Sequence, residues 1–295
     1  MNTTAAKVKT FLKFTRILDG KGYVFIAIFG YLLASGFRVE TILPIFLFVV
    51  ILYVAFAFAI NNCYDMDTDS MSRTKREKNL IASGKLSLRE GKLFSYVLAF
   101  SGFLLTALIF PHGLVIYVSM LILSYFYSAP PRLKGIPVAD MLSHGLFFGI
   151  LPFLFGILCA GGNIKEYVLI SISIFFYSCF LEFKNHLEDF EYDRDAGVKT
   201  SAVWLGERRR HVMYGLCAIH VITLFMLINP VFLTVERFTI GGVLTCGIVG
   251  ILPFKNKFLF KNKFLFKNKF LFKNKLRYLR VIDLLTVIIY GLRIL

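Results

Sequence analysis

The sequence predicts an all-α protein that crosses a membrane several times, and three observations support this fold class. Hydrophobic residues make up 57% of the 295 residues, and the mean hydropathy of the chain is +0.69. A soluble core of this size cannot bury so much apolar surface, whereas a bilayer solvates it. The apolar residues form long runs, and basic residues are concentrated in every second connection between these runs. We therefore expect a multi-pass helix bundle.

Nine apolar runs are the expected transmembrane helices. Several are shorter than the ~20 residues that cross the hydrocarbon core, so their ends should extend into the flanking sequence. Asp283 in the first turn makes the last run the weakest. The runs are Tyr23–Phe37, Ile42–Ile60, Leu93–Phe110, Gly113–Tyr127, Met141–Ala160, Tyr167–Phe183, Val212–Ile228, Phe238–Leu252 and Val281–Leu292.

The basic residues predict how the chain is oriented. If the runs cross the membrane in turn, the N-terminal segment and the second, fourth, sixth and eighth loops lie on one side. The basic residues of that side are Lys7, Lys9, Lys13, Arg16, Arg73, Lys75, Arg76, Lys78, Arg132, Lys134, Arg194, Lys199, Arg208, Arg209 and Arg210. The opposite loops hold only Arg38, Lys165 and Arg237. Positive charge marks the cytoplasmic face, which predicts an integral membrane protein with its N-terminus inside and its C-terminus outside.

The net charge of +16 includes eight lysines of a tandem KNKFLF repeat at Lys255–Lys275. We interpret residues 254–275 as a tolerated insertion in the last cytoplasmic loop of a single domain spanning residues 1–295. The alternative is an interfacial anchor for anionic lipid. No basic soluble domain is expected, which argues against nucleic-acid binding. The five scattered cysteines have no metal or disulfide spacing and are expected to pack between helices.

Two acidic motifs follow the second and sixth apolar runs. Both have the pattern Asn-x3-Asp-x3-Asp, and their positions are Asn61, Asp65 and Asp69, then Asn185, Asp189 and Asp193. Residues at i, i+4 and i+8 lie on one helical face, with neighbours ~5–6 Å apart. Each motif therefore predicts a stripe of one amide and two carboxylates, which Glu182 extends inward in the second motif.

Such stripes need a compensating positive charge. An ionisable group near the middle of a bilayer costs at least ~2.5–3.5 kcal/mol. Mg2+ prefers oxygen ligands and takes one or two carboxylates together with phosphate oxygens. A single Asp-x3-Asp pattern is weak evidence for a metal site, because acidic residues are common in solvated loops. Two equivalent copies predict a site where Asp65, Asp69, Asp189 and Asp193 hold Mg2+ on a diphosphate.

These motifs resemble those of the UbiA family of intramembrane prenyltransferases, which have nine helices and two Asp-rich motifs. Three segments extend the likeness over about residues 15 to 252. KNLIASGKLS after the first motif is similar to the family's "RPLPSG" element, FYSAPPRLKG to its Tyr-Ser loop, and NHLEDFEYDRDAGVKTSAVWLG to its second motif with a "GxKTxxxxLG" tail. The chain departs from the family at Asn62, where many members have Asp, and at Leu80, where many have Pro.

The resemblance implies two pseudo-repeated halves around a central cavity, and a mechanism. An allylic prenyl diphosphate would be clamped by Mg2+ on the four aspartates, and a hydrophobic acceptor would capture the carbocation. The Tyr127 ring could face that cation. The amides and basic residues expected to bind the donor are Asn61, Asn185, Arg73, Lys134 and Lys199.

Several other polar residues are weaker candidates. Glu182 or His186 could accept a proton, but such residues more often satisfy each other in a bundle. We expect the off-stripe acids Asp67, Glu188 and Glu191 to be solvated, Asp140 and Asp283 to pair with basic loops, and His144 and His220 to be internally hydrogen-bonded.

A membrane transporter is the competing class, since transporters also carry intramembrane acids and internal repeats. Here the acids lie at helix ends with metal-binding spacing, which favours an enzyme over a transporter or a silent lipid-binding scaffold. The acceptor is not identified by these motifs. An aromatic or quinone-precursor acceptor is favoured on frequency alone, with a lipid next, and carotenoid or tetrapyrrole acceptors remain open. Membrane lipid surrounds the protein, and no obligate protein partner is evident.

Overall fold

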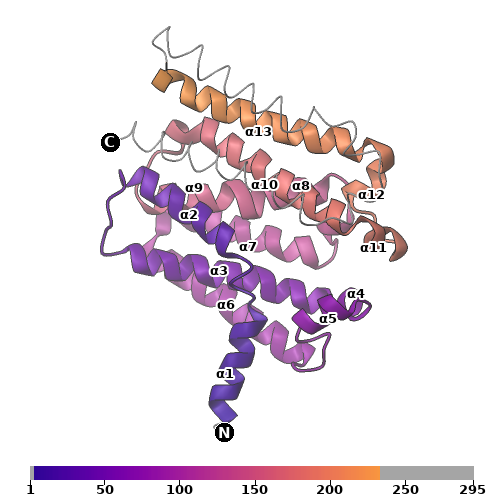
Figure 1. Ribbon diagram of the computed structural model, residues 1–295. Coiled ribbons are helices and arrows are strands. Elements are labelled where there is room, and N and C mark those ends of the chain that lie inside the picture. Colours follow the sequence, from indigo (N-terminus) through magenta and orange to yellow (C-terminus); the bar gives the residue numbers. More distant parts are fainter. Residues whose placement is uncertain (1–2, 233–295) are drawn as a thin grey trace.

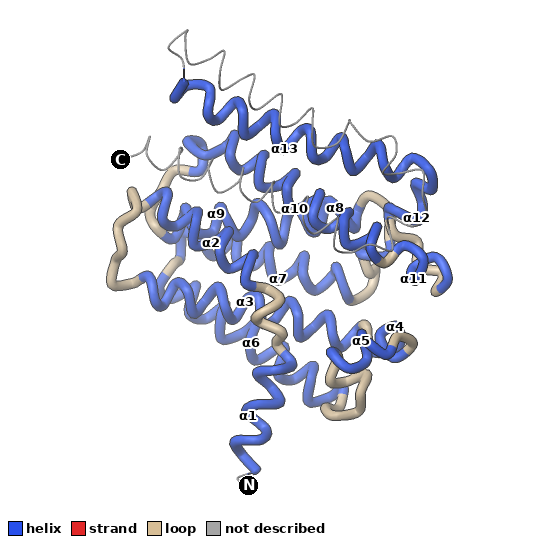
Figure 2. Tube along the Cα trace, in the orientation of Figure 1, coloured by secondary structure: helices blue, strands red, loops and turns tan. Residues whose placement is uncertain are grey.

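The computed structural model describes residues 3–232, which fold into helices without a strand among them (Figures 1 and 2). The α-helices are α1 (Thr3–Phe14), α2 (Lys21–Ala34), α3 (Leu43–Tyr64), α4 (Met66–Ser70), α5 (Arg73–Lys78), α6 (Leu88–Ile109), α7 (Leu114–Ser128), α8 (Ala139–His144), α9 (Leu151–Cys159), α10 (Val168–Glu188), α11 (Phe190–Asp195), α12 (Ser201–Leu205) and α13 (Arg209–Phe232). A π-helical turn joins α8 to α9, and short 3-10 turns lie at Pro111–Gly113, Leu133–Gly135, Ile164–Tyr167 and Gly206–Arg208.

The first seven predicted apolar runs coincide with α2, α3, α6, α7, the α8–α9 unit, α10 and α13. Five described segments are long and apolar enough to cross a membrane, and α2 is a shorter apolar helix. These five are Leu43–Tyr64, Leu88–Ile109, Pro111–Ser128, Ala139–Cys159 and Ile164–Glu188. The last two predicted runs and the KNKFLF repeat lie outside the described residues, so the total of nine helices stays a prediction.

Helix α6 shows how the sequence suits lipid rather than water. Beyond its first turn, its exposed side chains are all large hydrophobic or aromatic residues, and Leu93, Val97, Phe100, Leu104 and Leu108 recur among them every three or four positions. Its buried residues are mainly small or polar, namely Gly91, Ser95, Leu98, Gly102 and Thr106. The buried hydroxyls donate to backbone carbonyls of their own helix, at 2.8 Å for Ser95 and 2.7 Å for Thr106. Small residues inside and large apolar residues outside are typical of a helix that faces lipid.

Two glycines allow α2 and α9 to pack against each other. A Cβ at Gly30 would lie 2.1 Å from the carbonyl oxygen of Phe153, and one at Gly156 would lie 2.2 Å from that of Ala27. Backbone atoms cannot move aside as a flexible side chain can. The close approach therefore depends on these glycines, as in other small-residue contacts between membrane helices.

The π-helical turn Gly145–Ile150 lies directly before Pro152. Proline has no backbone N–H to donate to the preceding turn, which weakens the helical ladder there. The hydroxyl of Tyr53 on α3 donates to the carbonyl of Phe147 in this turn, at 2.5 Å. Tyr53 is fully buried, so this bond ties the irregular turn to the middle of the bundle.

The short helices α4, α5, α11 and α12 gather at one end of the bundle (Figure 1). Helix α3 leads into α4, and α10 leads into α11. Since the acidic motifs follow α3 and α10, the fold places both motifs at this shared end.

Candidate active site

The two acidic motifs have the same local backbone. In each motif a long helix ends just before the central aspartate, and a short helix begins just after it. Asp65 has φ −95° and ψ 4°, and Asp189 has φ −95° and ψ 3°. Each central aspartate N–H donates to the motif asparagine carbonyl, at 2.9 Å to Asn61 and 3.0 Å to Asn185. The predicted stripe is thus interrupted, because its central residue leaves helical geometry while the hydrogen bonds with a spacing of four residues continue.

Apart from Asp189, the residues that join the two motifs lie outside the predicted stripes. Lys75, at the start of α5, places its Nζ 3.0 Å from Oδ2 of Asp189. The same ammonium lies 4.2 Å from the centre of the Tyr192 ring, and the Tyr192 hydroxyl donates to the Thr68 carbonyl at 2.5 Å. Burial lowers the pKa of Lys75, but Asp189 outweighs that effect, so the pKa is raised overall. The loop of the first motif is therefore fastened to the second motif.

Asp65 is held by two cations from the loop after α7. Arg132 lies 3.0 Å from Oδ1 of Asp65, and Lys134 donates to the same oxygen. Asn61 donates to the other carboxylate oxygen at 3.0 Å. Burial lowers the pKa of Lys134, and the nearby Asp65 carboxylate opposes that shift. Lys134 thus lies beside the first motif, and Arg132 is a second cation that the motif spacing does not reveal.

Two of the predicted basic residues are exposed, and no contact of either with the motif aspartates is described. Arg73 is largely exposed and pairs with Glu77 of its own helix at 3.2 Å. Lys199 is also exposed. The described contacts of the first-motif loop with Asp189 are made by Lys75 rather than Arg73. Both lysine and arginine recur in this loop, so the sequence alone does not distinguish which side chain faces the acids.

The outer aspartates are partly buried. Asp69 accepts a hydrogen bond from Asn79 at 2.9 Å, and burial raises its pKa. Asn79 is itself fully buried and donates to the backbone of Asn62. The pKa of Asp193 is raised to about 6, mainly by burial and secondly by repulsion from Asp189. These carboxylates are thus short of positive charge in their present surroundings.

The carboxylates of the site suit a hard divalent cation whose remaining coordination positions are filled by oxygens of a bound ligand. Within residues 3–232, no three acidic, histidine or cysteine side chains come close enough together to hold a metal by themselves. Mg2+ needs only one or two carboxylates when substrate phosphate and water supply the other oxygens. The raised pKa values of Asp69 and Asp193 indicate carboxylates that an added cation would stabilise. The residues present therefore fit Mg2+ bound together with an oxygen-rich anion.

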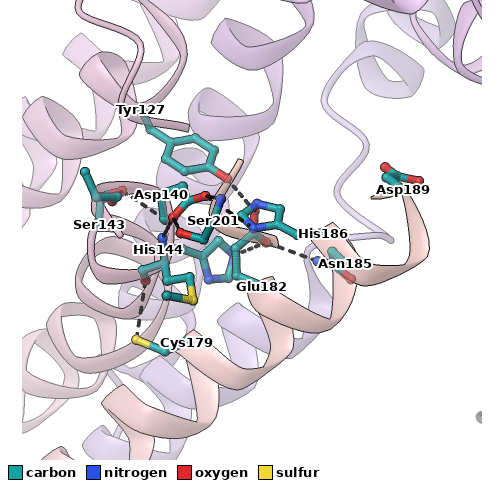
Figure 3. Close-up of polar contacts among 12 residues, drawn as sticks. Tyr127, Asp140, Ser143, His144, Cys179, Glu182, Asn185, His186, Asp189 and Ser201 are labelled. Atoms are coloured by element: carbon teal, nitrogen blue, oxygen red, sulfur yellow. Dashed lines mark hydrogen bonds and ion pairs between the residues drawn. The ribbon is translucent and has the colours of Figure 1, made fainter. Parts of the chain in front are cut away.

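A buried polar network lies inward of the second motif (Figure 3). Glu182 accepts a hydrogen bond of 2.5 Å from the Tyr127 hydroxyl and one of 3.1 Å from Asn185. His186 Nε2 lies 3.2 Å from Glu182, and His144 Nε2 lies 3.4 Å from it. Glu182 and His186 thus contact each other inside the bundle. This agrees with the expectation that such residues more often satisfy each other than act as a catalytic base.

Asp140 belongs to this network and not to the basic loops, so that expectation is wrong. It is fully buried and accepts hydrogen bonds from the Ser201 N–H at 2.6 Å and hydroxyl at 2.5 Å. Its Oδ2 also lies 3.4 Å from His186 Nδ1. Ser201 in turn accepts from the Val138 N–H at 2.6 Å, and Val138 has the unusual φ of 71°. The "KTS" segment of the second motif's tail thus positions an acid from a different helix.

The remaining polar expectations hold within the described residues. His144 lies 3.1 Å from the Ser178 hydroxyl, and His220 lies 3.0 Å from that of Ser173. The off-stripe acids are exposed, namely Asp67, Glu188 and Glu191. Cys63, Cys159 and Cys179 carry free thiols, and Cys63 and Cys179 are buried. Asp283 and Cys246 lie outside the described residues.

The fold and this site define an integral-membrane enzyme with two acidic motifs and several cations at one end of a helix bundle. The model of the UbiA prenyltransferase family matches residues 23–269. The chain belongs to this family and is therefore a prenyltransferase.

Individual relatives show how far the similarity extends. A digeranylgeranylglyceryl phosphate synthase of Sulfolobus acidocaldarius is 27% identical over 202 residues, covering 68% of this chain and 71% of that protein. A lycopene elongase/hydratase of Haloarcula japonica is 29% identical over 213 residues, covering 70% of each. A UbiA homologue from Archaeoglobus fulgidus, solved with GPP and Mg2+, has a TM-score of 0.67 and 25% identity, covering 96% of this chain and 98% of that one.

Proposed function

We propose that this enzyme transfers a prenyl group from an allylic prenyl diphosphate to a lipid of the glyceryl phosphate type, in a reaction that requires Mg2+. One observation carries the proposal. Two equivalent acidic motifs meet at one end of the bundle, where Lys75 and Tyr192 join them directly. Four carboxylates with cations between them suit a diphosphate bound through divalent metal. The Archaeoglobus fulgidus homologue bound to GPP and Mg2+ supports the same pairing of ligands.

The lipid acceptor is supported by the relatives. The curated relative from Sulfolobus acidocaldarius is a digeranylgeranylglyceryl phosphate synthase, and that product carries two geranylgeranyl chains on glyceryl phosphate. The corresponding substrates are geranylgeranyl diphosphate and geranylgeranylglyceryl phosphate. The aromatic acceptor predicted on frequency alone has no support among the relatives described above. The Haloarcula japonica relative favours a carotenoid as the second candidate.

Each site residue has a proposed role in this reaction. Asp65, Asp69, Asp189 and Asp193 would hold Mg2+, which would supply positive charge to the diphosphate. Lys75, Arg132 and Lys134 would move from carboxylate to phosphate oxygens as the diphosphate departs. Asn61 and Asn185 would orient the donor. The Tyr127 ring would face the allylic cation, and the surrounding bundle would exclude water. Arg73 and Lys199 are exposed, and we assign them no direct contact with the donor.

The membrane arrangement is part of the proposal. We place the motif end on the cytoplasmic side, with the N-terminus inside, because the basic loops of the sequence lie on that side. The donor would then arrive from the cytoplasm, while its isoprenoid tail lies in the bilayer. Nine spans in a single domain, with residues 254–275 as an insertion in the last cytoplasmic loop, complete this arrangement.

The test uses the full chain in lipid nanodiscs with Mg2+, labelled geranylgeranyl diphosphate and a panel of acceptors. The panel holds geranylgeranylglyceryl phosphate, lycopene and 4-hydroxybenzoate. We expect a labelled diether lipid, with its formation abolished by excess EDTA and by Asp65→Ala or Asp189→Ala. Diphosphate release that survives EDTA or either variant would contradict the metal-bound donor. Transfer only to lycopene or to the aromatic acid would overturn the lipid acceptor.

A further inference from the structure

The buried network behind the second motif lies inward of Asp189 and joins four helices. Tyr127 comes from α7, Asp140 from α8, Glu182 and His186 from α10, and Ser201 from α12. Asp140 is 0% exposed, His186 7% and Glu182 8%. Burying so many ionisable groups in a membrane bundle is costly unless they compensate one another. Such a network is therefore expected to have a function.

His186 lies between two buried carboxylates. Its Nε2 lies 3.2 Å from Oε1 of Glu182, and its Nδ1 lies 3.4 Å from Oδ2 of Asp140. An ionised carboxylate can only accept, so both ring nitrogens must carry hydrogen for both contacts to be attractive. This arrangement describes an imidazolium that links α8 to α10. Nδ1 is buried without a hydrogen bond, so its contact with Asp140 is an ion pair rather than a directed bond.

Glu182 is too fully occupied to serve as a base. One of its oxygens faces the Tyr127 hydroxyl at 2.5 Å and His186 at 3.2 Å. The other faces Asn185 at 3.1 Å and His144 at 3.4 Å. An acceptor hydroxyl would have to displace one of these groups before it could give Glu182 a proton. The geometry favours a positioning role.

The network reaches the reacting end of the site through two side chains. Glu182 precedes Asp189 by seven residues, which is about 10 Å along a helix. Asn185 lies between them, and Figure 3 shows Asp189 apart at the end of α10. Asn185 and Tyr127, the two residues proposed above to contact the donor, are both hydrogen-bonded to Glu182.

We propose that Asp140, His186 and Glu182 form an ionic clamp that positions Tyr127 and Asn185, and thereby decides whether the allylic cation reaches the acceptor or water. This inference rests on the proposed function. In transfer, the donor C1–O bond breaks with its electrons leaving on diphosphate. The acceptor hydroxyl oxygen then bonds to C1, and its proton passes to the diphosphate. In hydrolysis, water takes the place of the acceptor and the product is the prenyl alcohol.

The experiment compares two products of the full-length enzyme in nanodiscs with Mg2+, labelled geranylgeranyl diphosphate and geranylgeranylglyceryl phosphate. We expect His186→Gln to raise the ratio of prenyl alcohol to transferred product by about tenfold or more, because the ion pairs that orient Tyr127 and Asn185 are lost. His186→Lys keeps a cation and should return the ratio to within about threefold of wild type. The matched control is His220→Gln, which alters a buried histidine on α13 and should leave the ratio unchanged.

A second measurement separates positioning from collapse of the fold. The affinity of each variant for Mg2+ with inorganic diphosphate should stay within about threefold of wild type, because the four aspartates are untouched. Tyr127→Phe removes only the hydroxyl bonded to Glu182 and should also raise the alcohol ratio. Wild-type ratios in both His186→Gln and Tyr127→Phe would overturn the clamp. If the wild-type enzyme transfers to no acceptor, the proposed function fails and the clamp with it.

Discussion

Lys75 offers the sharpest test of how the two motifs cooperate. Its ammonium lies 3.0 Å from Asp189, and both side chains are partly exposed. An ion pair of this exposure contributes less than about 1 kcal/mol to stability, so Lys75→Met should unfold at nearly the wild-type temperature. A hydrogen bond to a charged group is worth about 1.5–3 kcal/mol when its partner is charged and held in place. If Lys75 stabilises the departing diphosphate, its loss should lower kcat/KM by about 10- to 150-fold.

The assay is diphosphate release from labelled donor under saturating Mg2+, with thermal unfolding measured on the same preparations. Arg73→Met is the control, because it removes a cation two residues away whose partner is Glu77. We expect less than about a twofold change for the control, as exposed charges act weakly through solvent. The reasoning is refuted if Lys75→Met retains activity within about twofold of wild type, or if the Arg73 variant loses as much.

Three further predictions address other parts of the molecule. Asn79→Leu should lower activity by at least about tenfold and destabilise the fold by about 1–3 kcal/mol, since Asp69 and the Asn62 carbonyl both lose their donor; activity and thermal unfolding of the variant measure both effects. Gly156→Val should reduce the yield of folded protein, because its Cβ would lie 2.2 Å from the Ala27 carbonyl; chromatography in detergent shows whether a monodisperse species forms. Deleting two KNKFLF units should leave the rate of transfer unchanged in purified protein, and loss of turnover would contradict the interpretation of the repeat as a tolerated insertion.

The sequence predicts the helices well because their signal is redundant. A transmembrane run contains many apolar residues, and a single substitution does not hide it. The structure accordingly places helices at the first seven runs and extends two of them into the acidic motifs, α3 to Tyr64 and α10 to Glu188. The irregular backbone carries a weaker signal. Pro152 is visible in the sequence, but the hydrogen bond from Tyr53 to the π-helical turn before it joins residues 94 positions apart.

The motif residues are also visible in the sequence, but their contacts are not. Spacing of four residues predicts that Asn61 and Asp65 meet, and they do at 3.0 Å. Contacts between distant segments have no such period. Lys75 meets Asp189 across 114 positions, and Asp140 meets Ser201 across 61. Nothing in the spacing distinguishes these partners from nearby alternatives such as Arg73. Local chemistry is therefore predictable, whereas the choice of long-range partner requires the fold.

The contacts across the site suggest why donor and metal should bind together. Four aspartates face Lys75, Arg132 and Lys134, so the acids exceed these cations by one charge. Mg2+ alone would have to compete with ammonium and guanidinium groups already paired with Asp65 and Asp189. A diphosphate alone would meet the unpaired carboxylates. Under the proposed function, Mg2+ and diphosphate together would offer each cation a phosphate oxygen in place of the carboxylate it loses, and the carboxylates would hold the metal. Charge balance therefore favours entry of the donor as its metal complex.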